Sequence, residues 1–387
     1  MSSKNRIRVL CLAISSMLVI SGYNYQEPQP TGLIKCTLKG VVIDRSQSSR
    51  ILLKKESEDP RIHGVYIPII NGKFEYVLNF DHEELYTLVF EDELLLGAFR
   101  PVVFISEQGI INFTLHPTDQ FDKNIVEGGN LNREYLDYYS ELSNKHQVIG
   151  NELNAKIEQL SKDGLDVASF VGALQDSAYR KLFHWQLQYV REHPTFVGYC
   201  ILVSGTRQVL QYSNEISQEY SDVYQMIFAP KYPDHPYTAQ MIDLFTGSSF
   251  KTGVPFIDFT AVDFTGKPIK FSELISGKPA VLHLWASWCG PCRKKGIELI
   301  PVYEEFRDKG FVVIGVAREK SISTAEAAVK LDKYPWKNLV EMNDAEQIWV
   351  KYGIGNAGGS VFLIDENGAI VAVSPSIDEI RDFLMNK

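Results

Sequence analysis

The sequence lacks three features that would each define a class of protein. It has no excess of basic charge: 39 Lys and Arg against 48 Asp and Glu give a formal net charge of −9, whereas a face that binds nucleic-acid phosphates needs surplus Lys and Arg. It has no apolar run near the roughly 20 residues of a membrane-spanning helix. It shows no internal repeat. Cysteines are few, with five in the chain. What remains is an ordinary globular composition, 45% hydrophobic and 22% charged.

Residues 1–22 predict a secretory signal peptide. Lys4, Arg6 and Arg8 make a basic start, the apolar run at 9–20 is too short to span a membrane, and small residues follow it. The alternative is a buried N-terminal helix, which the cationic flank disfavours. Export would place the mature chain in the periplasm or cell envelope, where disulfides can persist.

A lipid anchor is not expected on this signal. A lipoprotein would carry a cysteine directly after "ISG", and Tyr23 occupies that position. Cys11 lies inside the apolar run without small residues before it. Soluble export, or an uncleaved N-terminal tether, fits these residues better.

The chain of 387 residues suggests two or three folded units at roughly 150 residues each. Short alternating runs over 34–125 predict a small β-sandwich, with Asn71-Gly72 as a hairpin turn. Apolar residues recur at helical spacing over 130–245, which predicts a helical connector with an aromatic core. The Pro-rich stretch 228–237 is interpreted as a linker within that connector.

Residues 253–387 alternate strand and helix, in the expected order β-β-β-α-β-α-α-β-β-α, which predicts an α/β domain. A hairpin is expected at Thr265-Gly266, and "AVLHLW" (280–285) has the apolar pattern of a buried strand. Two capping boxes predict helix starts: Ser323 with Glu326, and Ser376 with Glu379.

The most informative stretch is "WASWCGPCRKK", in which Cys289 and Cys292 follow the predicted buried strand and open a helix. Unpaired N–H groups and the dipole at a helix start stabilise a thiolate, so the pKa of Cys289 is expected to be low. Cys292, one helical turn further, can then resolve a mixed disulfide. Pro291 falls early in the helix, where its missing N–H costs nothing.

Other uses of this cysteine pair fit the residues less well. A zinc site needs a second pair of ligands, but Cys36 and Cys200 each stand alone in sequence. A c-type haem needs His after the second cysteine, and Arg293 stands there. We therefore expect redox chemistry without metal or cofactor. Cys36 and Cys200 are interpreted as isolated buried thiols, with a disulfide between them as the open alternative.

"GKPAVLHLWASWCGPCR" resembles the active site of the thioredoxin superfamily, and the stretch from Phe256 to Cys292 is similar to its exported TlpA/ResA-type branch. The resemblance covers 253–387. The β-rich and helical part before it resembles the domain that precedes such modules in envelope proteins of Bacteroides-type bacteria. The resemblance implies that Cys289 is the nucleophile and Cys292 the resolving thiol. It also implies supporting roles for Trp285, Trp288, Gly290 and Pro291. Peroxiredoxin chemistry is disfavoured, because Ala286 stands where that motif has Thr.

Several positions depart from the family pattern. His283 replaces the buried acid six residues before the nucleophile, and is either a proton acceptor for the resolving cysteine or a core histidine. Lys295 stands where TlpA/ResA-type proteins often have Glu, and we expect it to be solvated. Ile297 replaces a helix-kinking proline, with Gly296 as a possible source of bending. Gly359 replaces the cis-proline, so its peptide bond is expected to be trans, because a non-proline cis bond costs about 3 kcal/mol.

The sequence therefore predicts an exported thiol–disulfide oxidoreductase, acting as a reductase on protein disulfides and recharged by a reducing partner such as a membrane electron carrier. Two alternatives stay open. One is an envelope binding or scaffold protein whose thioredoxin-like module does not cycle, suggested by Lys295, Ile297 and Gly359. The other is a disulfide isomerase or oxidase. Substrate, electron donor, oligomeric state and the role of the N-terminal half are not determined.

Overall fold

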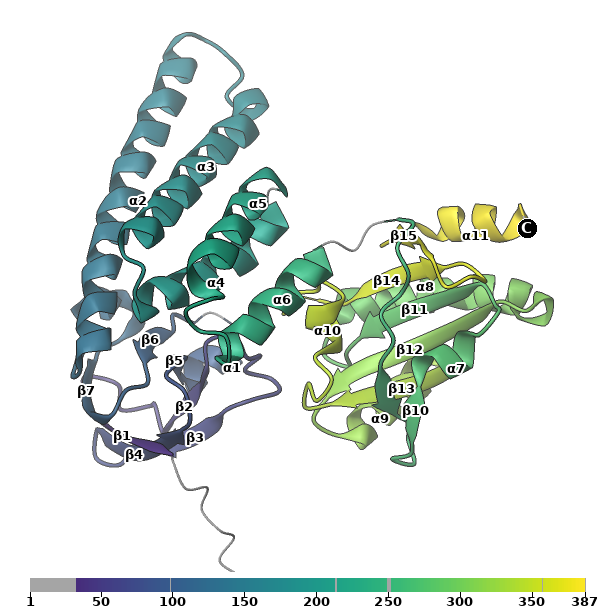
Figure 1. Cartoon of the computed structure of the whole chain (residues 1–387), viewed down its shortest axis with the longest axis horizontal. Coiled ribbons are helices and arrows are strands. Elements are labelled where there is room, and N and C mark those ends of the chain that lie inside the picture. Colours follow the sequence, from purple (N-terminus) through teal and green to yellow (C-terminus); the bar gives the residue numbers. More distant parts are fainter. Residues whose placement is uncertain (1–32, 98, 213, 249–251, 357, 387) are drawn as a thin grey trace, which may run out of the picture. The chain divides into compact units, whose positions relative to one another are not determined.

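The protein is described here by a computed structural model that covers residues 33–97, 99–212, 214–248, 252–356 and 358–386 (Figure 1). The predicted signal peptide and the question of a lipid anchor fall outside these residues. Ile34–Lys387 form one compact unit. Within the described ranges, no helix is both long enough and apolar enough to cross a membrane.

The N-terminal part is β-rich, with two four-stranded sheets of order β4-β1-β7-β8 and β3-β2-β5-β6. Buried side chains from both sheets, including Leu38, Phe104 and Phe113, pack into one apolar cluster. The elements are β1 (Ile34–Val42), β2 (Arg50–Lys55), β3 (Val65–Pro68), β4 (Lys73–Phe80), β5 (Leu85–Phe90), α1 (Glu91–Leu95), β6 (Val102–Ile105), β7 (Gly109–Leu115), η1 (Thr118–Lys123) and β8 (Ile125–Glu127).

The predicted turn at Asn71-Gly72 is present, but the hairpin is not. Both residues have positive φ, +51° and +69°, as a tight turn of this kind requires. Yet β3 pairs with β2 and β4 pairs with β1, and only the Ile70–Lys73 bridge joins the two sides of the turn. The chain therefore crosses from one four-stranded sheet to the other at this turn.

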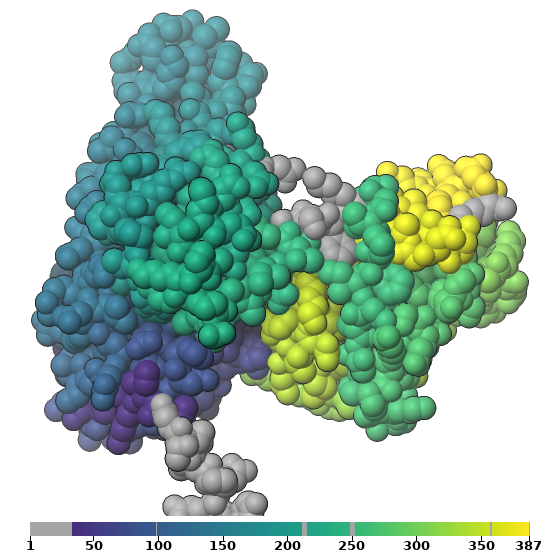
Figure 2. Space-filling view, in the orientation of Figure 1, coloured from purple at the N-terminus to yellow at the C-terminus, as the bar shows by residue number. Residues whose placement is uncertain are grey.

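The helical part begins with two long helices, α2 (Asn130–Lys162) and α3 (Ala168–Glu192), which lie side by side in Figure 1. Gly164, with φ +69°, lies in the turn that joins them, and the space-filling view shows this end standing clear of the other helices (Figure 2). The predicted aromatic core is confirmed for Phe183, Tyr220 and Tyr224, whereas Tyr179 is exposed. The remaining helices are α4 (Phe196–Tyr212), α5 (Asn214–Val223), the π-helical turn η2 (Tyr224–Phe228) and α6 (Pro236–Ser248).

Residues 229–235 form the turn that joins η2 to α6, so the stretch 228–237 does connect two helices, but its ends are packed into the core. Phe228 and Tyr237, at its ends, are fully buried and 3% exposed, and both pack on the ring of Tyr199. The Tyr237 hydroxyl oxygen accepts a hydrogen bond from the Leu85 N–H at 2.7 Å. The prolines end one helix and begin the next, and the aromatic residues between them supply core.

The C-terminal part is a seven-stranded sheet of order β10-β9-β13-β12-β11-β14-β15. The three central strands β11, β12 and β13 are parallel, and β14 runs antiparallel to β11. The elements are β9 (Thr260–Val262), β10 (Pro268–Lys270), α7 (Phe271–Ile275), β11 (Ala280–Trp285), α8 (Gly290–Phe306), η3 (Arg307–Lys309), β12 (Val312–Glu319), α9 (Ile322–Asp332), β13 (Lys337–Met342), α10 (Ile348–Lys351), β14 (Ser360–Ile364), β15 (Ile370–Val373) and α11 (Ile377–Met385).

Two expectations for this domain are corrected and two are confirmed. The expected order lacks the short helix α7 between β10 and β11, and it lacks β13, a short buried strand whose polar residues hide its pattern. The helix assigned to the Ser323 capping box begins at Ile322 after Ser321, whose side chain makes no cap bond. The hairpin at Thr265-Gly266 is present between β9 and β10. The Ser376 capping box is also present, with Glu379 as its reciprocal partner.

Candidate active site

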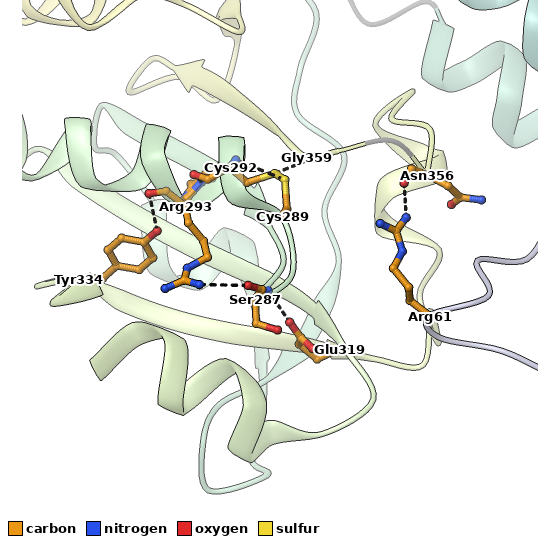
Figure 3. The surroundings of a disulfide bond; sticks show 10 residues. Arg61, Ser287, Cys289, Cys292, Arg293, Glu319, Tyr334, Asn356 and Gly359 are labelled. Atoms are coloured by element: carbon orange, nitrogen blue, oxygen red, sulfur yellow. Dashed lines mark hydrogen bonds between the residues drawn. A yellow bond between two sulfur atoms is a disulfide. The ribbon is translucent and has the colours of Figure 1, made fainter. Parts of the chain in front are cut away.

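Cys289 and Cys292 form a disulfide where β11 ends and α8 begins (Figure 3). Cys289 is the residue that precedes the helix, in an extended conformation, and its Sγ accepts from the Cys292 N–H at 3.3 Å. The Gly359 N–H donates to Cys292 Sγ at 3.1 Å. Backbone donors thus face both sulfurs, and the first N–H groups of a helix favour negative charge at its start. The arrangement can stabilise a thiolate.

The two cysteines are nearly buried, with Cys289 4% and Cys292 7% exposed. Both line a pocket of about 320 Å³, to which His283, Lys295 and Gly359 also contribute. The pocket therefore brings together the redox pair and three of the positions at which the sequence departs from the family pattern.

His283 is 1% exposed, and its Nε2 lies 3.1 Å from the carbonyl oxygen of Cys292. Because a carbonyl only accepts, Nε2 carries the proton and Nδ1 carries the lone pair; Nδ1 has no hydrogen-bond partner among the described residues. Burial, reinforced by the charge of Lys295 and opposed by the bond to Cys292, lowers the pKa of His283 to about 4. The imidazole is therefore neutral at pH 7, with a free lone pair beside the disulfide.

Lys295 and Gly296 differ from what the sequence suggested. The Lys295 ammonium is not freely solvated, because it donates to the carbonyl oxygen of Pro375 at 2.7 Å. A Cβ on Gly296 would lie 2.4 Å from the Tyr334 hydroxyl and 2.8 Å from the ring of His283. Gly296 thus permits close packing of α8 on these two rings. The helix does contain a proline, Pro301, further along.

Gly359 brings the chain unusually close to the redox pair. No cis peptide bond occurs in the described ranges, so its peptide bond is trans, as expected. A Cβ at Gly359 would lie 1.8 Å from the carbonyl oxygen of Leu284, which no side chain can tolerate. At Gly358, a Cβ would lie 3.7 Å from Cys289 Sγ. The contact at 358 would be an ordinary one, so it is glycine at 359 that lets the strand entry approach β11.

The loop before Cys289 is held by polar contacts that the sequence did not reveal. Glu319, buried at the end of β12, accepts from the Ser287 N–H at 2.6 Å. Arg293 makes two bonds to Asp332, at 2.7 and 2.6 Å, and a longer one to the Ser287 carbonyl. Tyr334 donates to the Arg293 carbonyl (Figure 3). In the sequence, only the positions of Glu319 at the end of a strand and of Arg293 on the first turn of α8 could have indicated these contacts.

The two tryptophans of the motif have different surroundings. Trp285 is fully buried and lies edge-on to Tyr334, with ring centroids 5.3 Å apart. Trp288 is half-buried between the ring of Trp349, at 5.9 Å, and the guanidinium of Arg61, which lies 3.5 Å from its ring centroid. Gly290 and Pro291 form the first turn of α8, as expected.

Cys36 and Cys200 are free thiols buried in separate apolar clusters, which confirms their interpretation as isolated cysteines. Burial, the largest cause, raises the pKa of Cys36 to about 11 and raises that of Cys200 as well. Neither thiol therefore ionises readily.

A Cys-Gly-Pro-Cys pair at a strand–helix junction of a mixed sheet defines a thioredoxin-like domain. Residues 252–373 match the AhpC/TSA family. Through this domain the chain belongs to that family of thioredoxin-like proteins, and the resemblance predicted for the C-terminal domain is confirmed.

Its relatives include proteins named for disulfide chemistry. The thiol-disulfide oxidoreductase ResA of Bacillus anthracis is 31% identical over 116 residues, which are 30% of this chain and 64% of the relative. The chain thus spans less than two thirds of that protein. The soluble secreted antigen MPT53 of Mycobacterium bovis is 30% identical over 132 residues, 34% of this chain and 73% of the relative. The crystal structure of the thioredoxin domain of a thiol-disulfide oxidoreductase from Bacteroides vulgatus is 26% identical, covers 36% of this chain and 98% of its own, and superposes with a TM-score of 0.33.

Proposed function

We propose that this protein is a thiol–disulfide oxidoreductase that acts on protein disulfides through Cys289 and Cys292. The observation that carries the proposal is the disulfide between them at the start of α8, with N–H groups of Cys292 and Gly359 directed at its sulfurs. Such donors stabilise a thiolate, which is the attacking species in thiol–disulfide exchange. The names of the ResA relatives support the same reaction class.

In the proposed reaction, the reduced pair presents Cys289 as a thiolate. It attacks one sulfur of the substrate disulfide, forming a mixed disulfide and releasing the other substrate sulfur as a thiolate that takes up a proton. Cys292 then loses its proton and attacks Cys289 Sγ, releasing the second substrate thiol. Two electrons pass to the substrate, and the protein is left with the Cys289–Cys292 bond.

We assign supporting roles to the surrounding residues. His283 directs its Nε2–H to the Cys292 carbonyl and keeps a free lone pair at Nδ1, so it can accept a proton from Cys292 only as a weak base. Trp285 supports the site from β11, and Trp288, Gly290 and Pro291 shape its rim. Gly359 supplies a donor to Cys292 Sγ.

We further propose that the protein works in the reducing direction in the periplasm or cell envelope. The Gly-Pro dipeptide between the cysteines resembles that of reducing thioredoxins. One relative is named a soluble secreted antigen, which supports export. An oxidising compartment would require a reducing donor, and a membrane-bound electron carrier fits that need.

The N-terminal half is proposed to be a separate β-sandwich (34–125) and helical connector (130–245) that recognise substrates or position the module. One apolar cluster shared by the two four-stranded sheets supports the sandwich arrangement.

The first test is the reduction potential of the Cys289–Cys292 pair, measured by equilibrating purified protein with glutathione or dithiothreitol buffers and counting free thiols. A reversible two-electron transition near about −270 mV is expected for a reductase, whereas one near about −120 mV would indicate an oxidant or isomerase. An inert pair would contradict the proposal and favour a binding or scaffold protein.

The second test traps substrates. Cys292→Ala removes the resolving thiol, so mixed disulfides through Cys289 should accumulate in cells and run as larger species on non-reducing gels. The double variant with Cys289→Ala is the control and should trap nothing. If Cys292→Ala also traps nothing, the cycle written above is wrong.

A further inference from the structure

One loop of the N-terminal β-rich part reaches the redox site. Residues 56–64 connect β2 to β3, and from this loop the Arg61 guanidinium lies 3.5 Å from the ring centroid of Trp288, the residue before Cys289. Arg61 also donates to the carbonyl oxygen of Asn356, three residues before Gly359 (Figure 3). A single side chain therefore contacts both segments that flank the disulfide.

Arg61 is fixed in place by Asp59. Its Nε and one terminal nitrogen bond the two carboxylate oxygens at 2.8 and 2.7 Å, and its backbone N–H donates to the same carboxylate at 2.8 Å. Asp59 is completely buried. Two-point pairing with a buried carboxylate holds the planar guanidinium in one orientation, which a lysine could not reproduce.

Asp59 and Arg61 belong to a closed ring of contacts. Arg318, 4% exposed in β12, has one nitrogen 3.4 Å from Asp59 Oδ2, and its guanidinium lies 5.0 Å from the ring centroid of Trp349. Trp349 in turn contacts Trp288, which lies under Arg61. The contacts thus link five side chains in a closed ring, in the order Arg61, Asp59, Arg318, Trp349 and Trp288.

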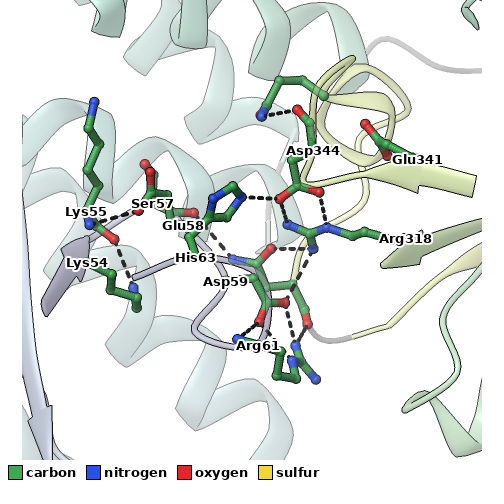
Figure 4. Close-up of polar contacts among 12 residues, drawn as sticks. Lys54, Lys55, Ser57, Glu58, Asp59, Arg61, His63, Arg318, Glu341 and Asp344 are labelled. Atoms are coloured by element: carbon green, nitrogen blue, oxygen red, sulfur yellow. Dashed lines mark hydrogen bonds and ion pairs between the residues drawn. The ribbon is translucent and has the colours of Figure 1, made fainter. Parts of the chain in front are cut away.

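Arg318 also has hydrogen-bond partners within the C-terminal domain. Asp344 binds its guanidinium at two points, and Asn356 Oδ1 accepts from it at 2.9 Å. His63, also in the 56–64 loop, lies 2.9 Å from Asp344 Oδ2 (Figure 4). The loop is therefore attached to the C-terminal domain by a buried polar network as well as by the ring of contacts.

We infer that Arg61 is a positioning residue of the redox site, which holds Trp288 and the backbone at Asn356 in the arrangement that receives a polypeptide disulfide. The inference rests on the proposed function. With glycine at both 358 and 359, the backbone at these two positions has more freedom to lose on binding than a proline would leave it. We call the contacts of Arg61 with Trp288 and Asn356 the clamp. Because the clamp forms before the substrate arrives, the entropy of ordering this backbone is not lost on binding, so the clamp lowers KM more than it raises kcat.

The experiment compares wild-type protein with Arg61→Ala, Arg61→Lys and Arg50→Ala in the reduction of insulin and of the small disulfide 5,5′-dithiobis(2-nitrobenzoate). Arg50 is a matched control: it pairs with Glu91 and lies over Tyr66, within the same β-rich part. For Arg61→Ala we expect KM for insulin to rise about tenfold, with kcat within twofold and the small disulfide unaffected. Arg61→Lys should be intermediate, and Arg50→Ala should match wild type.

A double-mutant cycle with Trp288→Phe tests whether Arg61 acts through Trp288. In that background, Arg61→Ala should raise KM for insulin less than twofold. An undiminished tenfold effect would mean that Arg61 does not act through Trp288, and no effect in either background would mean that it does nothing at the site. Both results overturn the inference.

A measurement without turnover separates this inference from the proposed function. Acrylamide should quench the fluorescence of Trp288 more strongly in Arg61→Ala than in wild type, with the Trp288→Phe pair supplying the background to subtract. If wild type fails to reduce insulin, the proposed function is wrong. The clamp is overturned separately if Arg61→Ala leaves the quenching of Trp288 unchanged.

Discussion

His283 illustrates how burial alone changes the chemistry of a residue. It lies beneath the disulfide with its ring 6.1 Å from that of Trp285 and at the same centroid distance from Tyr334. An imidazolium there would lose its hydration and gain no carboxylate partner within the described residues, so the neutral form is favoured. Burial at this position would raise the pKa of a carboxylic acid, whereas it lowers the pKa of a histidine.

The low pKa of His283 predicts a pH-dependent stability. Between pH 6.5 and about 4 the unfolded chain binds a proton that the folded chain does not, so the free energy of unfolding should fall by up to about 3 kcal/mol as the pH is lowered through this window. His283→Gln keeps a donor for Cys292 but does not titrate. Urea unfolding at pH 7 and pH 4.5 should show a smaller difference for this variant, and an equal difference would show that His283 is not the titrating group.

Glu341 in β13 presents the opposite case. It is 2% exposed, one carboxylate oxygen accepts from the Ile348 N–H at 2.8 Å, and the other has no partner in the described part of the chain. Burial chiefly, with the charge of Asp344, raises its pKa to about 7 against the opposing charge of Arg318. Between pH 4.5 and about 7 the folded chain holds a proton that the unfolded chain has lost, so stability falls as the pH rises.

Glu341→Gln should therefore stabilise the protein at pH 8, by up to about 3 kcal/mol, and have much less effect at pH 4.5. The physical reason is that the amide keeps the acceptor for Ile348 without placing a charge in the interior. Thermal unfolding at the two pH values measures the difference. A stability gain of the same size at both would exclude ionisation as the cause.

At the scale of elements, β11, the following loop, α8 and the entry to β14 build the site. Strand β11 pairs with β12 and β14 on its two sides, so its end is held rigidly and the loop that follows has a fixed origin. These elements were predictable, because β11 is an apolar run interrupted only by His283 and α8 begins with proline and a cysteine pair. The close approach at Gly359 was not, since it depends on where β14 meets β11.

Gly359→Ala tests that approach. The new Cβ would lie 1.8 Å from the Leu284 carbonyl oxygen, so the strand entry must shift and weaken the bond from Gly359 N–H to Cys292 Sγ. We expect a loss of more than about 2 kcal/mol of stability and a changed reduction potential of the pair. Gly150→Ala, in α2 and away from the cysteines, is the control, because a Cβ there meets nothing within 4 Å. Equal behaviour of the two variants would refute the steric argument.

At the scale of the whole chain, the buried network of Asp59, Arg318 and Asp344 links the β-rich part to the C-terminal domain. Burial would raise the pKa of Asp344, but its bonds to Arg318 outweigh this and lower it, as expected for a paired carboxylate. Removing one partner of such a network leaves the others buried without compensation, which is more costly than losing a surface ion pair.

Asp59→Ala should therefore separate the unfolding of the two parts. We expect calorimetry to show two thermal transitions in place of one, with the earlier lowered by several degrees. Arg50→Ala, which removes an exposed ion pair of the β-rich part, should leave a single transition. One unchanged transition in Asp59→Ala would mean that this network does not couple the two parts.

Much of this protein was determined by the sequence itself. The thioredoxin-like domain, the redox pair, the isolated thiols and the helical part were all readable, because each depends on neighbours close in sequence or on apolar periodicity. Strand β13 and the crossing at Asn71-Gly72 were not predicted, since pairing between distant segments overrode the local signals. Arg61, Asp59 and Arg318 carried no local signal at all. Only the tertiary structure brings residues some 230 to 300 positions apart into one site, and their role depends on that contact.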